Sequence, residues 1–322
     1  MRRRDVITLL AAVLATPCAA RAQPPPRRAR LGYVWIGAAG SEHSTLDGLR
    51  QGLAELSYVE GRHFVIEDRY ADSQPERIPV IVTDLLRSGV DLFLAPGNVV
   101  VQAAMQQTAA VPIVATAPDL FASGFVASLA HPGGNVTGIS LAAGAAIAEK
   151  WLELAKEIVP HLTAIAWLGN SGIAYADSAR RAASTLKTEL LYFGARNDEE
   201  LNRALAAIEM AQVGALILES DPWLVSKRAE IIGFAARRRL PAIYGNPDYM
   251  PSGGLLAYAT NIREAWRRLA TYVDKILNGA RPNDLPVEQA TRFELIINLK
   301  TAKALDLEIP GSLLARADEV IE

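Results

Sequence analysis

The chemistry open to this chain is limited first by the reactive side chains that it lacks. Its one cysteine is Cys18, and its four histidines are spread without a metal-binding spacing: His43, His63, His131 and His161. The sequence contains no G-x-S-x-G nucleophile elbow, no H-E-x-x-H zinc motif and no G-x-x-x-x-G-K-[ST] phosphate loop. We therefore expect no catalytic residue, no metal and no cofactor, although His43 stays a candidate for contact with a ligand.

Small polar and acidic residues at the ends of apolar runs suit reversible binding instead. Backbone N–H groups and hydroxyls around Ser41, Gly97 and Asn98 could hold an anionic group. Asp119 or Asp221 could pair with an ammonium group, and Asp119 could equally cap the helix that follows it. These residues predict a site for a polar small molecule.

Aromatic residues near the same positions could pack on the apolar part of such a ligand. Trp223 follows an Asp-Pro pair in a predicted loop, and Tyr244 stands at the end of a predicted strand. Trp35 and Trp167 occupy matched strand ends, where packing beneath a helix is the commoner role. We therefore expect Trp223 and Tyr244, rather than the other two, to contact the ligand.

Two stretches that are near copies of each other indicate where these residues meet. VPIVATAPD (111–119) resembles LPAIYGNPD (240–248), and further echoes pair residues 31–37 with 164–169 and 90–96 with 214–220. A chain built from two similar α/β halves tends to have a cleft between them. The repeat predicts that the site lies in that cleft.

Short apolar runs alternate with amphipathic segments, which predicts α/β architecture with two doubly wound parallel-sheet lobes. In the first half we expect strands at 30–36, 64–70, 91–95, 113–116 and 136–138, with helices at 44–56, 75–88, 99–108 and 125–130. In the second half we expect strands at 164–168, 190–193, 215–218, 242–244 and 255–258, with helices at 145–158, 174–187, 198–210 and 224–239. A helix at 263–277 could return to the first lobe, and an extended piece (287–293) and a helix (295–305) complete the chain.

The loops at the carboxyl ends of these strands should carry the site, because open parallel sheets bind ligands there. The rule selects the loops 37–43, 96–98, 116–121, 169–173, 219–223 and 244–249. If the two sheets face each other, all of these loops line one cleft.

The first 22 residues have the features of an export signal. Three arginines precede an apolar stretch at 6–15, and the A-x-A sequence that ends at Ala22 predicts cleavage there. Residues 23–29 would form a Pro/Arg-rich tether, and Pro17 makes lipid attachment at Cys18 unfavourable. The export signal predicts a periplasmic protein, and we expect the exported chain not to span the membrane. The formal net charge of −2 and the absence of a basic stripe argue against nucleic-acid binding.

Several long segments resemble the periplasmic substrate-binding proteins of ABC transporters, in the group that includes tryptophan and tyrosine binders. The resemblance covers essentially the whole chain after the leader. It is carried by residues 48–79, 124–140, 239–261 and 267–322, with HPGGNVTG and LPVEQ…FELIINLKTAKAL as the most specific stretches.

The resemblance implies a type I periplasmic-binding fold with a central cleft and a three-segment hinge. One lobe would comprise residues 30–140 and 261–284, and the other residues 141–260 and 285–322. Such a protein closes on a small ligand, delivers it to a membrane permease and catalyses nothing. The family's contact loops fall on Gly40, Ser41, Gly97, Asn98, Asp119, Asn170, Asp221, Tyr244, Gly245 and Asn246.

The chain departs from the family's pattern in the pocket itself. Residues 118–122 lack the proline after the aspartate and the second glycine of the common G-D-P-V-G loop, and Asn98 stands where relatives commonly have threonine. Specificity for an aromatic amino acid is therefore not carried over. We expect a monomer that binds a small polar molecule, the alternatives being a sensor that signals to a membrane receptor or an exported α/β enzyme.

Overall fold

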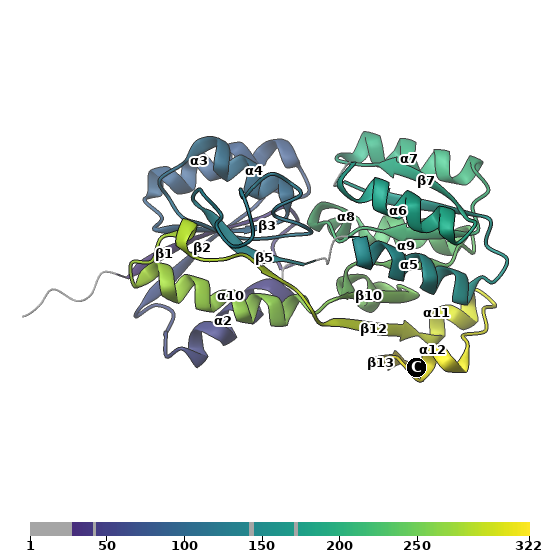
Figure 1. Cartoon of the computed structure of the whole chain (residues 1–322). Helices are drawn as coiled ribbons and strands as arrows, with labels where there is room; N and C mark the ends of the chain where they lie inside the picture. The colour runs from purple at the N-terminus through teal and green to yellow at the C-terminus, as the bar shows by residue number, and fades with distance from the viewer. Residues whose placement is uncertain (1–27, 41–42, 142–144, 171–172) are drawn as a thin grey trace, which may run out of the picture.

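The computed structural model describes residues 28–40, 43–141, 145–170 and 173–322 (Figure 1). The expected leader, most of the expected tether and Ser41 lie outside these ranges. Within them, the chain forms two α/β lobes, each built on one sheet in which parallel pairing dominates. The predicted fold class is confirmed.

The first sheet has six strands in the order β11-β5-β4-β3-β1-β2, all paired in parallel. Its strands are β1 (Ala29–Trp35), β2 (Phe64–Tyr70), β3 (Leu92–Pro96), β4 (Ile113–Ala117), β5 (Val136–Ser140) and β11 (Glu288–Gln289). Every residue of β3, β4 and β5 is buried. Such continuous burial is typical of a parallel sheet covered on both faces, which explains the uninterrupted apolar runs.

The second sheet has seven strands in the order β13-β12-β10-β9-β8-β6-β7. Its strands are β6 (Ala164–Gly169), β7 (Glu189–Gly194), β8 (Ala215–Leu218), β9 (Ala242–Tyr244), β10 (Leu256–Thr260), β12 (Phe293–Asn298) and β13 (Glu319–Ile321). Pairing is parallel except between β10 and β12. The C-terminal tail therefore extends a parallel sheet with two strands, β12 and β13, that run in the opposite direction.

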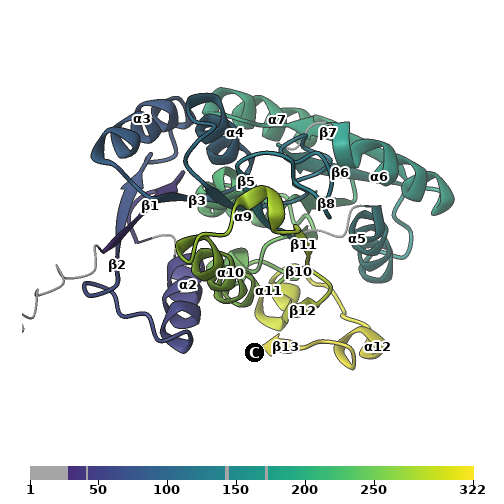
Figure 2. The ribbon, with the colours of Figure 1, turned by 60° about the vertical axis from the view of Figure 1, so that its left-hand side comes forward.

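Helices cover both faces of each sheet (Figures 1 and 2). In the first lobe they are α2 (His43–Glu55) and α10 (Ile262–Leu277) on one face, with α3 (Ile78–Ser88) and α4 (Asn98–Gln107) on the other. In the second lobe α5 (Ala145–Ile158) and α6 (Ile173–Thr185) oppose α7 (Asp198–Met210) and α9 (Arg228–Arg237). Short elements complete the lobes: α8 (Pro222–Ser226), α11 (Leu299–Ala304), α12 (Gly311–Leu314) and the 3-10 turns η1 (Pro75–Arg77), η2 (Pro247–Ser252) and η3 (Pro282–Asp284).

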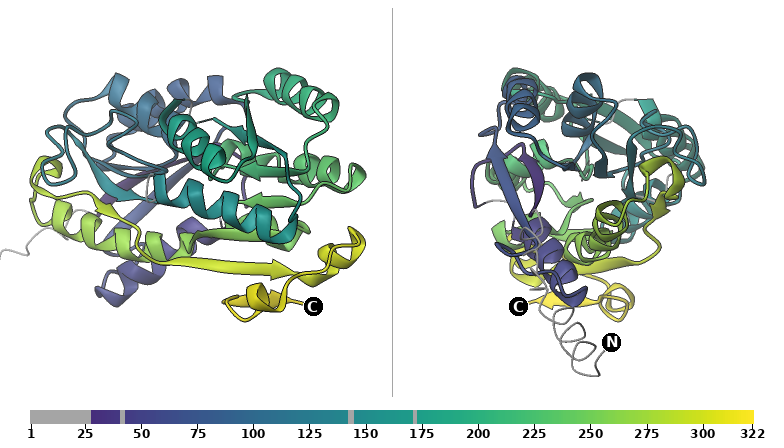
Figure 3. Two further views of the ribbon diagram at one scale, coloured as in Figure 1. Left: turned by 45° about the vertical axis from the view of Figure 1, so that its right-hand side comes forward. Right: turned by 90° about the vertical axis from the view of Figure 1, so that its left-hand side faces the viewer.

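The chain passes between the lobes three times, as the family resemblance implied. The passages run from β5 to α5, from β10 to α10 and from β11 to β12. The hydroxyl of Thr260 donates to the carbonyl of Leu141 at 2.6 Å and so ties the second passage to the first. In Figure 3 the long β12 leaves the first lobe and runs beneath the second.

The expected lobe boundary at residue 285 is wrong. Leu285 belongs to the apolar core of the first lobe and accepts a hydrogen bond from the hydroxyl of Thr137 at 2.7 Å. Glu288 and Gln289 then pair with β5. The tail therefore leaves the first lobe only after Gln289, because β11 completes the edge of the first sheet.

Three predicted helices also differ from the structure. Residues 125–130 form no helix, because the turn before them bonds the N–H of Phe125 to Leu120 and a Pro-Gly-Gly sequence follows. The helix expected at 295–305 begins only at Leu299, since Leu295 to Asn298 pair with β10 in the sheet. The helix expected at 224–239 is divided at Lys227 into α8 and α9.

The return of α10 to the first lobe is confirmed, and two glycines make it possible. A Cβ atom on Gly48 or Gly52 would collide with the backbone carbonyl of Arg263 or Arg267, respectively. The helices α2 and α10 therefore pack with their backbones in direct contact along this stretch. An ion pair from Arg267 to Glu55 at 2.7 Å joins the same two helices.

Replacing Gly52 by alanine is expected to destabilise the protein by about 1–3 kcal/mol, because the added methyl group pushes α10 off α2. Gly233→Ala in α9 is the matched control. A Cβ there meets only the end of the flexible Arg237 side chain, at 3.3 Å. This control should stabilise the protein by about 0.5–1 kcal/mol through helix propensity. Urea denaturation of both variants measures the two effects, and an equal change in both would contradict the packing argument.

Candidate functional site

A pocket lies between the lobes where strands of both sheets end. From the first lobe it is lined by Trp35, Thr45, Pro96, Gly97, Thr116, Ala117 and Pro118, and from the second by Ser220, Pro222, Asn246 and Asp248. The hinge passages and α10 add Leu141, Ile262 and Trp266. We call this the interlobe pocket. Four of the predicted loops contribute to it, those after β3, β4, β8 and β9.

The interlobe pocket is nearly closed. Its open volume is about 20 Å³, which is room for about one water molecule. The lobes touch around it: Ser44 donates to Asp248 at 2.8 Å, and a Cβ on Gly97 would lie 2.7 Å from Pro222. A ligand of amino-acid size therefore enters only when the lobes move apart.

Aromatic rings form one wall of the interlobe pocket. Trp35 and Trp266 are buried, and Tyr33 joins them, with ring centroids 6.4 Å from Trp35 and 5.8 Å from Trp266. The hydroxyl of Tyr33 lies 2.7 Å from that of Thr45. The expectation that Trp35 only packs beneath a helix was incomplete, since this residue also lines the pocket.

A side cavity of about 10 Å³ adjoins the interlobe pocket and shares Pro96, Gly97 and Pro222 with it. Asn98 from the first lobe and Asp221 from the second both line this side cavity. The Oδ1 atom of Asn98 is buried and has no hydrogen-bond partner among the described residues. No lysine or arginine is among the residues that line the side cavity. It therefore offers acceptors and lacks a donor with positive charge.

Asp221 is held in place by its own lobe. It caps α8 by accepting from the N–H of Leu224 at 3.0 Å, and its second oxygen accepts from the amide of Asn170 at 3.2 Å. Only 6% of the residue is exposed. Burial raises the pKa of this carboxyl group above its ordinary value, although the hydrogen bonds act in the opposite direction. A cationic partner would offset that cost.

The other predicted contact residues of the first lobe have local roles. Asp119 uses one oxygen to accept from the N–H groups of Phe121 and Ala122, at 3.0 and 2.9 Å, so it caps a turn. Gly40 is exposed, with φ of 82°, and a Cβ added to it would have no atom within 4 Å. Neither residue lines the interlobe pocket as the structure describes it.

In the second lobe, the predicted aromatic contacts are buried within the protein. Tyr244 stacks on Tyr249 at 4.5 Å, and burial raises its pKa well above the ordinary value. Gly245 lies against Trp151, where a Cβ would approach the indole ring to 2.6 Å. Neither Tyr244 nor Gly245 lines the interlobe pocket or the side cavity, so both shape the lobe rather than its described cavities.

Trp223 and Asn246 lie nearer to the cleft. Trp223 lines the side cavity and crosses to the other lobe, where its indole N–H donates to the carbonyl of Ser73 at 3.0 Å. Asn246 lines the interlobe pocket and caps η2 by accepting from the N–H of Asp248 at 2.8 Å. Asn170, in contrast, is oriented by Asp221 and by the buried carboxylate of Glu219.

Sequence reasoning missed Trp266, Thr45 and Ser220. Trp266 lies in the middle of an amphipathic helix, where an apolar residue indicates a core position. Ser220 belongs to a predicted loop, directly before the predicted contact residue Asp221, but the serine by itself carries no distinguishing signal. Only the packing of α10 against α2 shows that Trp266 and Thr45 share one pocket.

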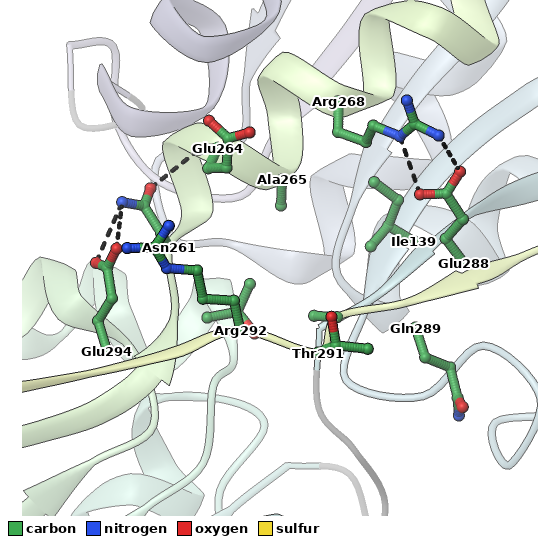
Figure 4. Close-up of a pocket in the computed structure, with 12 residues that line it drawn as sticks. Ile139, Asn261, Glu264, Ala265, Arg268, Glu288, Gln289, Thr291, Arg292 and Glu294 are labelled. Atoms are coloured by element: carbon green, nitrogen blue, oxygen red, sulfur yellow. Dashed lines mark hydrogen bonds and ion pairs between the residues drawn. The ribbon is translucent and has the colours of Figure 1, made fainter.

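A second cavity, of about 390 Å³, lies at the hinge (Figure 4). The helix α10 separates it from the interlobe pocket: Ile262 and Trp266 face the pocket, whereas Asn261, Ala265 and Arg268 face the hinge. Arg268 pairs with Glu288 at 2.9 Å, and the amide of Asn261 donates to Glu294 at 3.1 Å. The contact of Asn261 with Glu294 joins the second passage of the hinge to the third, whereas the ion pair of Arg268 with Glu288 holds β11 to α10 within the first lobe.

Membrane-spanning helices and metal clusters are both missing from the described part of the chain. Among the described residues, no helix is long and apolar enough to cross a membrane. The same residues contain no group of three or more His, Cys, Asp or Glu side chains that could hold a metal ion.

Known proteins provide a direct comparison. The tyrosine-binding protein of Clostridioides difficile is 27% identical over 276 residues, which cover 83% of this chain and 79% of that protein. A conserved domain protein from Vibrio cholerae superposes with a TM-score of 0.83 at 26% identity, covering 91% of this chain and 100% of the other. An ABC domain from Streptococcus pneumonia in complex with L-Trp gives the same TM-score at 22% identity and covers 92% and 100%.

A family model decides the assignment, because it spans both lobes and the hinge. The model described as ABC transporter substrate binding protein matches residues 38–321. The match includes β3, β4, β8 and β9, the strands whose following loops line the interlobe pocket. This chain belongs to the family of ABC transporter substrate-binding proteins.

Proposed function

We propose that this substrate-binding protein captures an amino acid in the interlobe pocket and delivers it to the permease of its transporter. The observation that carries the proposal is the side cavity, which is lined both by Asn98, whose buried Oδ1 has no hydrogen-bond partner among the described residues, and by the buried Asp221. An ammonium group has three donors and a positive charge, so it complements two acceptors in a site without a cation. The tyrosine-binding and L-Trp-bound relatives support the same ligand class.

The rest of the ligand would occupy the interlobe pocket once the lobes have parted to admit it. The rings of Trp35 and Trp266 offer an apolar surface for its side chain. Hydroxyl groups of Thr45, Thr116 and Ser220 could donate to its carboxylate. Backbone N–H groups near Gly97, together with Gly40 and Ser41, would add donors from the first lobe.

The mature protein would act outside the cytoplasm as a monomer. The arginines and the apolar stretch that precede Ala22 favour export and cleavage after that residue. Pro17 argues against a lipid anchor at Cys18. Closure of the two lobes would present a surface made from both of them to the permease, so docking would depend on bound ligand.

Thermal unfolding with each of the twenty L-amino acids tests the ligand class. A ligand at about 100 times its Kd adds about 2.7 kcal/mol of stability, so the cognate amino acid should raise the Tm clearly. The corresponding des-amino acids, which lack the ammonium group, serve as matched controls and should raise it far less. A protein stabilised by purines or organic acids but by none of the amino acids would overturn the proposal.

A further inference from the structure

One indole side chain bridges the two lobes on the side-cavity flank of the cleft. Trp223 belongs to α8 of the second lobe, and its N–H donates at 3.0 Å to the carbonyl of Ser73, which follows β2 in the first lobe. Only 1% of Trp223 is exposed. The hydrogen bond is therefore shielded from water and exists only while the lobes are together.

The donor side of this bridge is held rigidly. Asp221 caps the first turn of α8, which fixes the backbone of Trp223. Lys227 lies over the indole ring at 5.8 Å and is itself paired with Asp198 at 2.5 Å. Little side-chain freedom is left for the indole to lose when the lobes close.

The acceptor side is equally well defined. Asp72 and Ser73 both have left-handed backbone, with φ of 53° and 62°. Their N–H groups donate to Gly37 and Ile36, at 3.2 and 2.7 Å, which holds the turn in this conformation. Backbone of this kind in residues other than glycine is sparsely populated and is often found at functional positions. Here it aims the Ser73 carbonyl at the facing lobe.

A second hydrogen bond runs beside the first. The hydroxyl of Ser73 donates to that of Ser226 at 2.8 Å, and Ser226 in turn donates to the carbonyl of Trp223 at 2.6 Å. Hydrogen bonds thus link the three residues in a ring across the cleft. It contains only groups of the protein, so it does not depend on the identity of the ligand.

We propose that Trp223 is a positioning residue, which holds the two lobes together through its hydrogen bond to Ser73 and so sets the residence time of the ligand. We call the contacts among Trp223, Ser73 and Ser226 the latch. The inference rests on the proposed function, because it assumes a ligand held between the lobes. A ligand leaves only after the lobes open, so a contact made only in the closed state slows dissociation and leaves association nearly unchanged.

The test is Trp223→Phe, which keeps an aromatic ring and removes the N–H. Trp151→Phe is the matched control, since the indole of Trp151 donates to the carbonyl of Tyr258 at 2.7 Å within the second lobe. The probe is the amino acid that most raises the Tm of the wild type, and surface plasmon resonance gives both rate constants. Trp223→Phe should speed dissociation about two- to tenfold with little change in association, whereas Trp151→Phe should change neither.

Ser226→Ala keeps the latch testable if Trp223→Phe folds poorly, because it removes the hydroxyl that accepts from Ser73 and donates to the carbonyl of Trp223 and leaves the indole hydrogen bond in place. It should speed dissociation by a smaller factor. Wild-type rates in both Trp223→Phe and Ser226→Ala would overturn the latch and leave the proposed function intact. A wild type that binds no amino acid would refute the proposed function, and the latch with it. Equal acceleration by Trp151→Phe would overturn the latch as well, since it would indicate a general loss of structure in the second lobe.

Discussion

Replacing Asp221 by asparagine is expected to weaken amino-acid binding by at least about 30-fold and to raise the Tm of the ligand-free protein. The first effect follows because removing one partner of a buried charge pair costs about 2–5 kcal/mol of binding free energy. The second follows because the amide can still cap α8 and carries no charge to desolvate. Weaker ligand binding together with a higher Tm of the ligand-free protein is the result expected for a residue that serves binding and lowers folding stability.

The pH dependence of both effects has a defined sign. Burial raises the folded pKa of Asp221 above its unfolded value. The carboxyl group therefore contributes stability below its unfolded pKa, and this contribution is lost as the pH rises through the folded pKa. The stability advantage of Asp221→Asn should accordingly grow with pH in that range. The ligand affinity of the wild type should also rise with pH there, because acid protonates the carboxylate that pairs with the ammonium group.

Asp119→Asn is the control, since Asp119 was the other acidic candidate. Its carboxylate caps an exposed turn through Phe121 and Ala122, so its loss should change affinity less than about threefold. Isothermal titration calorimetry gives the affinities, and calorimetric melts give the Tm values. A large loss of affinity in Asp119→Asn with normal binding in Asp221→Asn would move the ammonium site to the first lobe.

Replacing Gly97 by alanine is expected to weaken ligand binding about five- to 150-fold, because the new methyl group prevents full closure. Its Cβ would lie 2.7 and 2.8 Å from two carbons of the Pro222 ring in the facing lobe. A proline ring cannot rotate away as a long side chain can. Overpacking of this kind costs about 1–3 kcal/mol, and this cost falls on the closed state. The backbone strain of an alanine at the φ of 82° and ψ of 159° of Gly97 lowers the stability of the open and closed states alike.

Gly89→Ala is a control for a positive φ without an interlobe contact. Gly89 has φ of 78° and ψ of 49°, and no atom lies within 4 Å of its Cβ position, whereas Gly97 has φ of 82° and ψ of 159°, a conformation that only glycine adopts readily. Gly89→Ala should therefore cost folding stability without loss of affinity. Small-angle scattering provides a second measurement: ligand-saturated Gly97→Ala should keep a larger radius of gyration than ligand-saturated wild type. Equal radii together with equal affinity would show that Gly97 and Pro222 do not limit closure.

The cleft loops illustrate how far the sequence predicts the site. Loops after β3, β4, β8 and β9 line the interlobe pocket as expected, because parallel strands expose their carboxyl ends on one edge. Individual side chains were harder to predict. Tyr244 follows the same rule as Asn246 two residues later, yet its ring packs on Tyr249 inside the lobe. Whether a residue at a strand end faces the cleft or the core depends on neighbours that come from distant segments.

The C-terminal tail shows a limit of a different kind. The helix expected at 295–305 was begun too early, since residues 295–298 are Leu-Ile-Ile-Asn, in which the isoleucines favour a strand, and they form part of β12 beside the open edge of β10. Likewise Leu285 to Gln289 remain with the first lobe because β5 offers the edge of that sheet. The position of such an edge is not visible in the local sequence.

The sequence by itself determined the two α/β lobes, since continuous apolar runs separated by amphipathic helices are stable only as covered parallel sheets. It also determined the class of protein, through long segments shared with a family, and placed Asn98 and Asp221 at strand ends. Only the tertiary structure decided that these two residues line one cavity, that Trp266 lines the interlobe pocket and that Trp223 donates a hydrogen bond to the opposite lobe. Strand and helix patterns arise from neighbours along the chain, whereas contacts between lobes depend on how two separately packed cores dock across a hinge.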